Sequence, residues 1–190
     1  MRSSKHNKLP ERLGLYDPSN ERDSCGVGFI ANIKGIASHE IIQDANHLLC
    51  KMDHRGAAGS EKNSGDGAGI LTALPHDFLE FVAKKDLKVD LPKIGQYAAG
   101  NIFLPKEKKV RNRCKSIFEK ICQDQKQKVL GWRRVPVDPI ASDLGKTARE
   151  AAPVIEQVFI SSGNGNDKEK FERQLYLIRK YASSSIKADN

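Results

Sequence analysis

The sequence lacks the features that mark membrane, secreted and metal-binding proteins. Its 190 residues contain no apolar run near the ~20 residues that a membrane span needs. The N-terminal stretch has no apolar core, which excludes a secretory signal, and its acidic residues disfavour a transit peptide. None of the four cysteines pair as C-x-x-C, which disfavours a zinc site or a redox dithiol. We therefore expect a cytoplasmic protein with no membrane partner, with an organelle as the alternative compartment.

The net charge of +8 lies within one segment. Residues 105–134 contain 11 Lys or Arg and 3 Asp or Glu, a difference equal to the whole surplus. Apolar residues recur there at helical spacing, which predicts an amphipathic helix with a solvated basic face. The segment lacks the interleaved aromatics that stack nucleic acid bases, so we expect no nucleic acid partner.

Hydrophobic periodicity predicts a chain of mixed strands and helices. Strands are expected at 25–33, 70–74, 96–105, 128–135 and 154–160, and helices after 38, 75, 105 and 166. The glycine-rich stretch from Gly56 to Gly69 predicts a loop. This order is typical of layered α+β or α/β packing. Three cysteines, Cys50, Cys114 and Cys122, lie in apolar helical patterns and are expected in the core.

Cys25 differs from the other cysteines because it opens a predicted strand behind a polar leader. The plainer interpretation is a small buried residue at the strand start. Cleavage of the Ser24–Cys25 bond would instead give Cys25 both a thiol and a free α-amine. An α-amine titrates near ~7.7–8.0 and could take the proton of a thiol that titrates near ~8.5. One residue would then supply both the nucleophile and the base. Gly26 and Gly28 are expected to leave space beside the sulfur.

Three stretches carry a resemblance to a known family: CGVGF at 25–29, HRGA at 54–57 and GDGAGI at 65–70. Together with GWR at 131–133 and FER at 171–173, they closely resemble the start of the glutamate synthase large subunit. That region is a class II glutamine amidotransferase domain of the N-terminal-nucleophile hydrolase type.

The resemblance implies an α+β fold, a four-layer αββα sandwich that residues 25–190 represent incompletely, behind a propeptide at residues 1–24. It implies that Cys25 attacks the side-chain amide of glutamine, forms a thioester and releases ammonia for glutamate synthesis from 2-oxoglutarate. FMN and an iron–sulfur cluster are implied for later domains of a full-length enzyme. No cofactor is expected in this segment.

Arg55 and Asp66 match family elements and are the candidate site-supporting residues. Arg55 could instead bond the last carbonyls of a helix, and Asp66 could cap its own loop. The family's oxyanion hole uses an Asn-Gly pair in a context that Asn164-Gly165 lacks. Loss of one oxyanion donor costs ~10²–10³ in rate. The expectation is therefore little or no glutaminase activity from this chain alone. An inactive folding or assembly module, and another amidotransferase of the same superfamily, are the alternatives.

Overall fold

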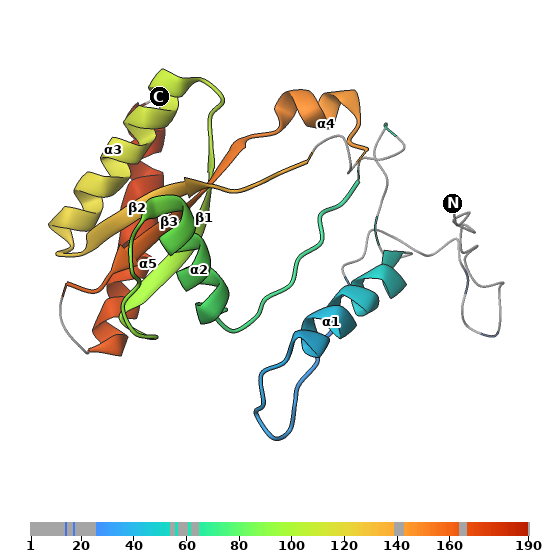
Figure 1. Cartoon of the computed structure of the whole chain (residues 1–190). Coiled ribbons are helices and arrows are strands. Elements are labelled where there is room, and N and C mark those ends of the chain that lie inside the picture. The colour runs from blue at the N-terminus through green and yellow to red at the C-terminus, as the bar shows by residue number, and fades with distance from the viewer. Residues whose placement is uncertain are drawn as a thin grey trace. The chain divides into compact units, whose positions relative to one another are not determined.

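The computed structural model describes residues 14, 17, 26–53, 56, 61, 65–138, 143–163 and 167–189. The chain divides into two compact units, residues 1–72 with 139–150 and residues 73–138 with 151–190. The first unit contains α1 (His39–Lys51), and α4 (Lys146–Ala151) ends at its boundary. The second contains α2 (His76–Leu87), β1 (Tyr97–Leu104), α3 (Lys108–Asp124), β2 (Lys128–Arg134), β3 (Val154–Ser161) and α5 (Lys168–Asp189) (Figure 1). In the described residues, no helix is long and apolar enough to cross a membrane.

The second unit is built on an antiparallel sheet in the order β1-β3-β2. Tyr97 pairs with Ser161 at one end of the β1–β3 ladder, and Leu104 pairs with Val154 at the other. Arg134 of β2 pairs with Glu156, and the β2–β3 register shifts between Val129 and Gly131. The last strand in the sequence is therefore the central one.

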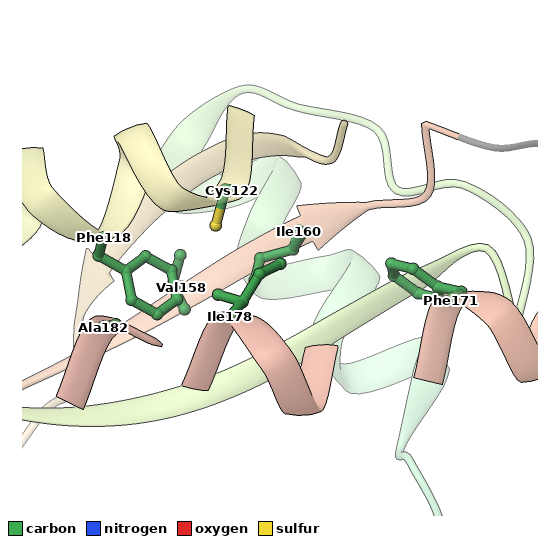
Figure 2. Packing of buried hydrophobic residues seen from close by; sticks show 7 residues of the cluster. All are labelled: Phe118, Cys122, Val158, Ile160, Phe171, Ile178 and Ala182. Carbon is green, nitrogen blue, oxygen red and sulfur yellow. The ribbon is translucent and has the colours of Figure 1, made fainter. Parts of the chain in front are cut away.

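One face of this sheet is covered by α3 and α5, as Figures 1 and 2 show. The side chains between the layers come from three elements and are almost fully buried: Phe118, Cys122, Val158, Ile160, Phe171, Ile178 and Ala182. The apolar positions of α3 recur every four residues, from Cys114 to Phe118 to Cys122, so one stripe of the helix faces inward. The predicted burial of Cys114 and Cys122 is confirmed at 6% and 0% exposure.

The opposite face carries a second cluster under α2. Leu79, Val82 and Ala83 of that helix pack with Leu91, Tyr97 and Phe159. Beside them, Arg133 is 8% exposed and donates to Asp86 at 2.8 Å and to Gln157 at 3.0 Å. A buried cation needs such partners, because an unpaired charge there would lose its hydration without compensation.

The basic segment forms α3 and β2, and not all of its cations face solvent as expected. Lys108, Lys109 and Lys120 are exposed. Arg111 and Lys115 turn toward the sheet and pair with Glu156 of β3 at 3.5 and 2.7 Å. These side chains are only 14–23% exposed, so part of the positive charge is used to dock α3 onto the sheet.

Prediction and structure also differ in the elements themselves and in the burial of one cysteine. Residues 26–33 and 70–74 are not strands, and Val27 is 92% exposed where burial was expected. A strand requires a hydrogen-bonded neighbour, and the described residues supply none to these stretches. Cys50 is exposed rather than in the core, because α1 has no buried residue. The short helix α4 was not predicted, since six residues are too few to show periodicity.

Candidate active site

Two of the three predicted site residues, Cys25 and Arg55, lie outside the described residues, as does Asn164-Gly165. Asp66 is described and is exposed, directly after Gly65. The structure describes three stretches that are near these residues in the sequence: the stretch that begins at Gly26, the helix α1, and the loop that begins at Gly65.

Gly26 and Gly28, which follow Cys25, allow close packing and do not leave open space. A Cβ atom on Gly26 would lie 2.6 Å from the Met52 sulfur. One on Gly28 would lie 2.7 and 2.8 Å from the two terminal carbons of Leu48. Both distances are far below an ordinary contact, so the absence of side chains lets α1 lie against this stretch. The expectation that these glycines leave room beside the sulfur is corrected here, because α1 side chains occupy that face.

The packing of Gly26 on Met52 joins two residues that are close in the sequence to predicted site residues. Gly26 follows Cys25, and its packing partner Met52 stands three residues before Arg55. The stretch then reverses at the predicted turn, where Asn32 Oδ1 accepts from the backbone N–H groups of Lys34 and Ile36. Gly35 adopts a φ of 68°, which favours glycine.

The face of this stretch opposite α1 is apolar and open. Val27, Phe29 and Ile33 alternate along it and are 92%, 91% and 102% exposed. Gly28 packs on Leu48 from the other side of the same stretch. The segment after Cys25 therefore has the pattern of a strand between two layers, with one layer present in the described residues.

The described cysteines differ in their chemical availability. Burial raises the pKa of the Cys122 thiol to about 12, with a smaller contribution from nearby Glu119. A thiol that stays protonated is a poor nucleophile. Cys114 is also buried, whereas Cys50 is exposed on α1. The two cysteines of α3 are therefore core residues rather than candidates for catalysis.

Sequence reasoning missed one contact in the first unit, between Glu61 and Thr147. Glu61, from the glycine-rich stretch, accepts a hydrogen bond through Oε1 from the backbone N–H of Thr147 at 2.9 Å. The partners are 86 residues apart, and no local pattern in the sequence pairs them. Gly145, two residues before Thr147, lies against the same carboxylate.

No cofactor site appears in the part of the chain that the structure describes. No group of three His, Cys, Asp or Glu side chains is placed to hold a metal ion among those residues. A shallow pocket along α5 is lined by Glu169, Glu172, Arg173, Tyr176 and Leu177. These side chains come from a single helix, and none is a predicted site residue.

Comparisons with known proteins identify the relationship. The chain is 44% identical to the NADH glutamate synthase of Saccharomyces cerevisiae, which it matches over 97% of its own length and 9% of that protein's. It is 37% identical to the NADPH glutamate synthase large chain of Bacillus subtilis, over 94% of this chain and 12% of the relative. It is 38% identical to ferredoxin-dependent glutamate synthase 1 of Arabidopsis thaliana, over 95% of this chain and 11% of the relative.

The chain thus spans about a tenth of the length of these curated relatives. The sequence model of one family, described as glutamine amidotransferases class-II, matches residues 25–190. That range contains every motif that carried the resemblance, from CGVGF at 25–29 to FER at 171–173. The chain therefore belongs to the class II glutamine amidotransferases.

Proposed function

We propose that Cys25, once residues 1–24 are removed, is the nucleophile of a glutaminase reaction. Its α-amine takes the thiol proton, and the sulfur attacks the side-chain amide carbon of glutamine. The carbon–nitrogen bond breaks, the proton passes to the leaving nitrogen, and ammonia departs from a γ-glutamyl thioester. Water then cleaves the thioester to give glutamate and the free thiol.

The observation that carries this proposal is the start of the family match at Cys25, directly after the proposed leader. The packing of Gly26 against Met52 supports it, since it brings together chain segments next to Cys25 and Arg55 in the sequence. Arg55 and Asp66 are the proposed site-supporting residues. The burial of Cys114 and Cys122 in the other unit leaves them no comparable role.

We also propose that the domain is a four-layer αββα sandwich. In this proposal the three-stranded sheet would be one of the two sheets, and α3 and α5, which cover one of its faces, would be its helical layer. Residues 26–33, with α1 on one side and an open apolar row on the other, have the pattern expected of the second sheet. Burial of Val27, Phe29 and Ile33 between sheets would remove their exposure to water, which favours association by about 25 cal/mol per Å².

In the longer protein, the ammonia would be used to make glutamate from 2-oxoglutarate. FMN and an iron–sulfur cluster would belong to the other domains, which are this chain's proposed partners. The three relatives described above are named for three different donors, NADH, NADPH and ferredoxin. The amidotransferase part is therefore common to synthases that differ in their electron source.

The test combines intact-mass spectrometry with a glutaminase assay of the full-length protein. The expected species begins at Cys25, and Cys25→Ala should abolish ammonia release from glutamine. Cys50→Ala is the matched control, because that thiol is exposed on α1 and should leave turnover unchanged. Full glutaminase activity in Cys25→Ala would overturn the proposal.

The same assay on the 190-residue chain separates the two interpretations of this segment. We expect the isolated chain to show little or no turnover. If the isolated chain begins at Cys25 and a glutamine-like electrophile labels it, the nucleophile is present even without turnover. A full-length protein that neither matures nor releases ammonia would favour an assembly module without catalysis.

A further inference from the structure

The outer side of α5 carries a regular stripe of exposed side chains. Together with α3 this helix covers one face of the sheet, and its inward residues Phe171, Ile178 and Ala182 are buried in the core (Figure 2). On the side away from the core, exposed residues recur every three or four positions, as do residues on one face of a helix. We call five of them the α5 stripe: Glu169, Glu172, Tyr176, Arg179 and Lys180.

The charges of the α5 stripe are sorted along the helix. Its two acids, Glu169 and Glu172, precede Tyr176, and its two cations, Arg179 and Lys180, follow that residue. Acids first and cations last also suit the dipole of a single helix. The dipole gives no reason for an aromatic ring at the boundary between the two charges, and Tyr176 is 53% exposed. The shallow pocket along α5 includes both acids and this ring, so the surface is hollowed there.

Within one chain these charges have only weak partners. Arg179 Cζ lies 5.5 Å from the centroid of the Tyr176 ring, and Lys180 Nζ lies 5.8 Å from it. The carboxylate of Glu172 lies 3.8 Å from Lys168 Nζ, and both of these side chains are mostly exposed. Ion pairs and cation–π contacts at exposed sites contribute little to stability. A second surface that presents opposite charges at the right spacing would therefore compete well for these groups.

The α5 stripe is complementary to itself when a second copy of the helix runs in the opposite direction. A two-fold axis beside Tyr176 places Glu169 of one copy opposite Lys180 of the other, and Glu172 opposite Arg179. Both pairings hold in one register, because the two residues of each pair are within one position of equal distance from the axis. One position is a rise of about 1.5 Å, which long side chains span easily. Symmetry doubles each pair, so four contacts between opposite charges surround two aromatic rings.

We propose that the α5 stripe is a self-association surface, on which a second copy of this chain binds through its own α5 in antiparallel orientation. The antiparallel arrangement also brings the opposite ends of the two helix dipoles together. One helix pair buries a small area, so the dimer is weak and reversible rather than obligate. This inference is independent of the proposed glutaminase function, since no residue of the stripe has a role in that reaction.

The first test is disulfide cross-linking of Tyr176→Cys in the full-length protein, with Cys50→Ala to remove the exposed thiol of α1. Under a mild oxidant we expect a bond between the two residues at position 176, because the two-fold axis brings them together. Mass spectrometry of the digested protein identifies the linked peptides. Lys120→Cys is the matched control, since it is exposed on the neighbouring helix α3 and lies outside the stripe. It should give only the background yield of random collisions.

Charge reversal then tests the register. Glu169→Lys with Glu172→Lys makes the stripe wholly positive, and Arg179→Glu with Lys180→Glu makes it wholly negative. Each reversed protein alone should lose the link at position 176 by about tenfold or more, because four attractive contacts become repulsive. An equal mixture of the two should restore the link between unlike chains. Recovery in the mixture also demonstrates that the reversed proteins are folded.

The outcomes decide the proposal. A link at position 176 that both reversals abolish and their mixture restores supports self-association through α5. A link that survives both reversals, or a mixture that does not restore it, would overturn the proposed pairing. A yield no higher than that of Lys120→Cys would also overturn it, and this is the result expected if another domain of the longer protein covers α5. Sedimentation equilibrium of the unsubstituted protein should show association that weakens with added salt, and a monomer at every concentration would contradict the proposal.

Discussion

Gly163→Ala should destabilise the second unit more than its small volume suggests. A Cβ atom on Gly163 would overlap the backbone carbonyl oxygen of Lys126 and lie 3.0 Å from its carbonyl carbon. Unlike a flexible side chain, this carbonyl cannot swing away. Lys126 is held at a φ of 57°, and its neighbour Gln127 is 3% exposed.

The surrounding hydrogen bonds make the site rigid. The Gly163 N–H donates to Gln127 Oε1 at 3.0 Å, and Gln127 Nε2 donates to Gln174 at 2.8 Å and to the Gln125 carbonyl at 2.9 Å. To relieve the overlap, the backbone of either Gly163 or Lys126 must move. This movement costs about 1–3 kcal/mol, as in other overpacked sites. It also weakens the Gly163–Gln127 bond, worth about 0.5–1.5 kcal/mol. Alanine also lowers the conformational entropy of the unfolded chain, which stabilises the folded variant by about 0.4–1 kcal/mol.

The expected loss in the free energy of unfolding is therefore about 2 kcal/mol, within a range of about 0.5–4 kcal/mol. Urea unfolding followed by the fluorescence of Trp132 measures it, because this is the only tryptophan and it packs edge-on against Phe118 at 5.3 Å. Gly100→Ala is the matched control, since its Cβ would meet only Val158 at an ordinary 3.9 Å. If Gly163→Ala unfolds at the same urea concentration as Gly100→Ala, the steric argument is wrong.

Three further predictions concern the same unit. Ile178→Ala should lower the free energy of unfolding by about 2–5 kcal/mol, because this side chain is 1% exposed in the cluster under α3 and α5, whereas exposed Tyr181→Ala should change it by less than about 1 kcal/mol. Asp86→Ala removes the partner of the buried Arg133 and should cost about 1–3 kcal/mol, while Asp86→Asn, which keeps an acceptor, should cost less; equal losses would contradict the pairing. The pKa of Cys122 is raised in the folded state, so the neutral thiol stabilises the fold below pH 9, and this contribution is lost as the pH rises toward about 12. Between pH 9 and 11, Cys122→Ala should therefore lose less stability than the wild type, as measured by urea titrations.

Local patterns predicted those elements whose partners lie within the described chain. The three strands of the sheet and the helices α2, α3 and α5 follow from periodicity, because each apolar stripe meets a neighbouring layer. Periodicity also predicted α1, although none of its residues is buried. The segments 26–33 and 70–74 have equally regular patterns, yet they are not strands, since a ladder needs a second strand to accept its hydrogen bonds. Periodicity reports which side of a segment would be buried, and it carries no information on whether the covering layer is there.

For the candidate site too, the sequence predicted some features and missed others. Cys25 stands out from the sequence because its position after the proposed leader would allow a specific chemistry, and the family match begins at that residue. The packing of Gly26 and Gly28 on α1 was misread, because a glycine signals close approach without naming what approaches. The contact of Glu61 with Thr147 left no local signal, since a hydrogen bond between residues 86 apart depends on the tertiary fold alone.

The strand order β1-β3-β2 has a consequence for how this protein is made. In the described sheet, β1 and β2 each pair with β3 alone, so neither ladder can form before β3 has been synthesised. At translation rates of 5–20 residues per second, the ribosome needs roughly 3–10 seconds to go from the end of β1 at Leu104 to the start of β3 at Val154. During that interval the nascent chain exposes two unpaired strands and the apolar stripe of α3. The arrival of β3 then completes both ladders at once, and we expect the interval before it to be the one in which the nascent chain is most prone to aggregate.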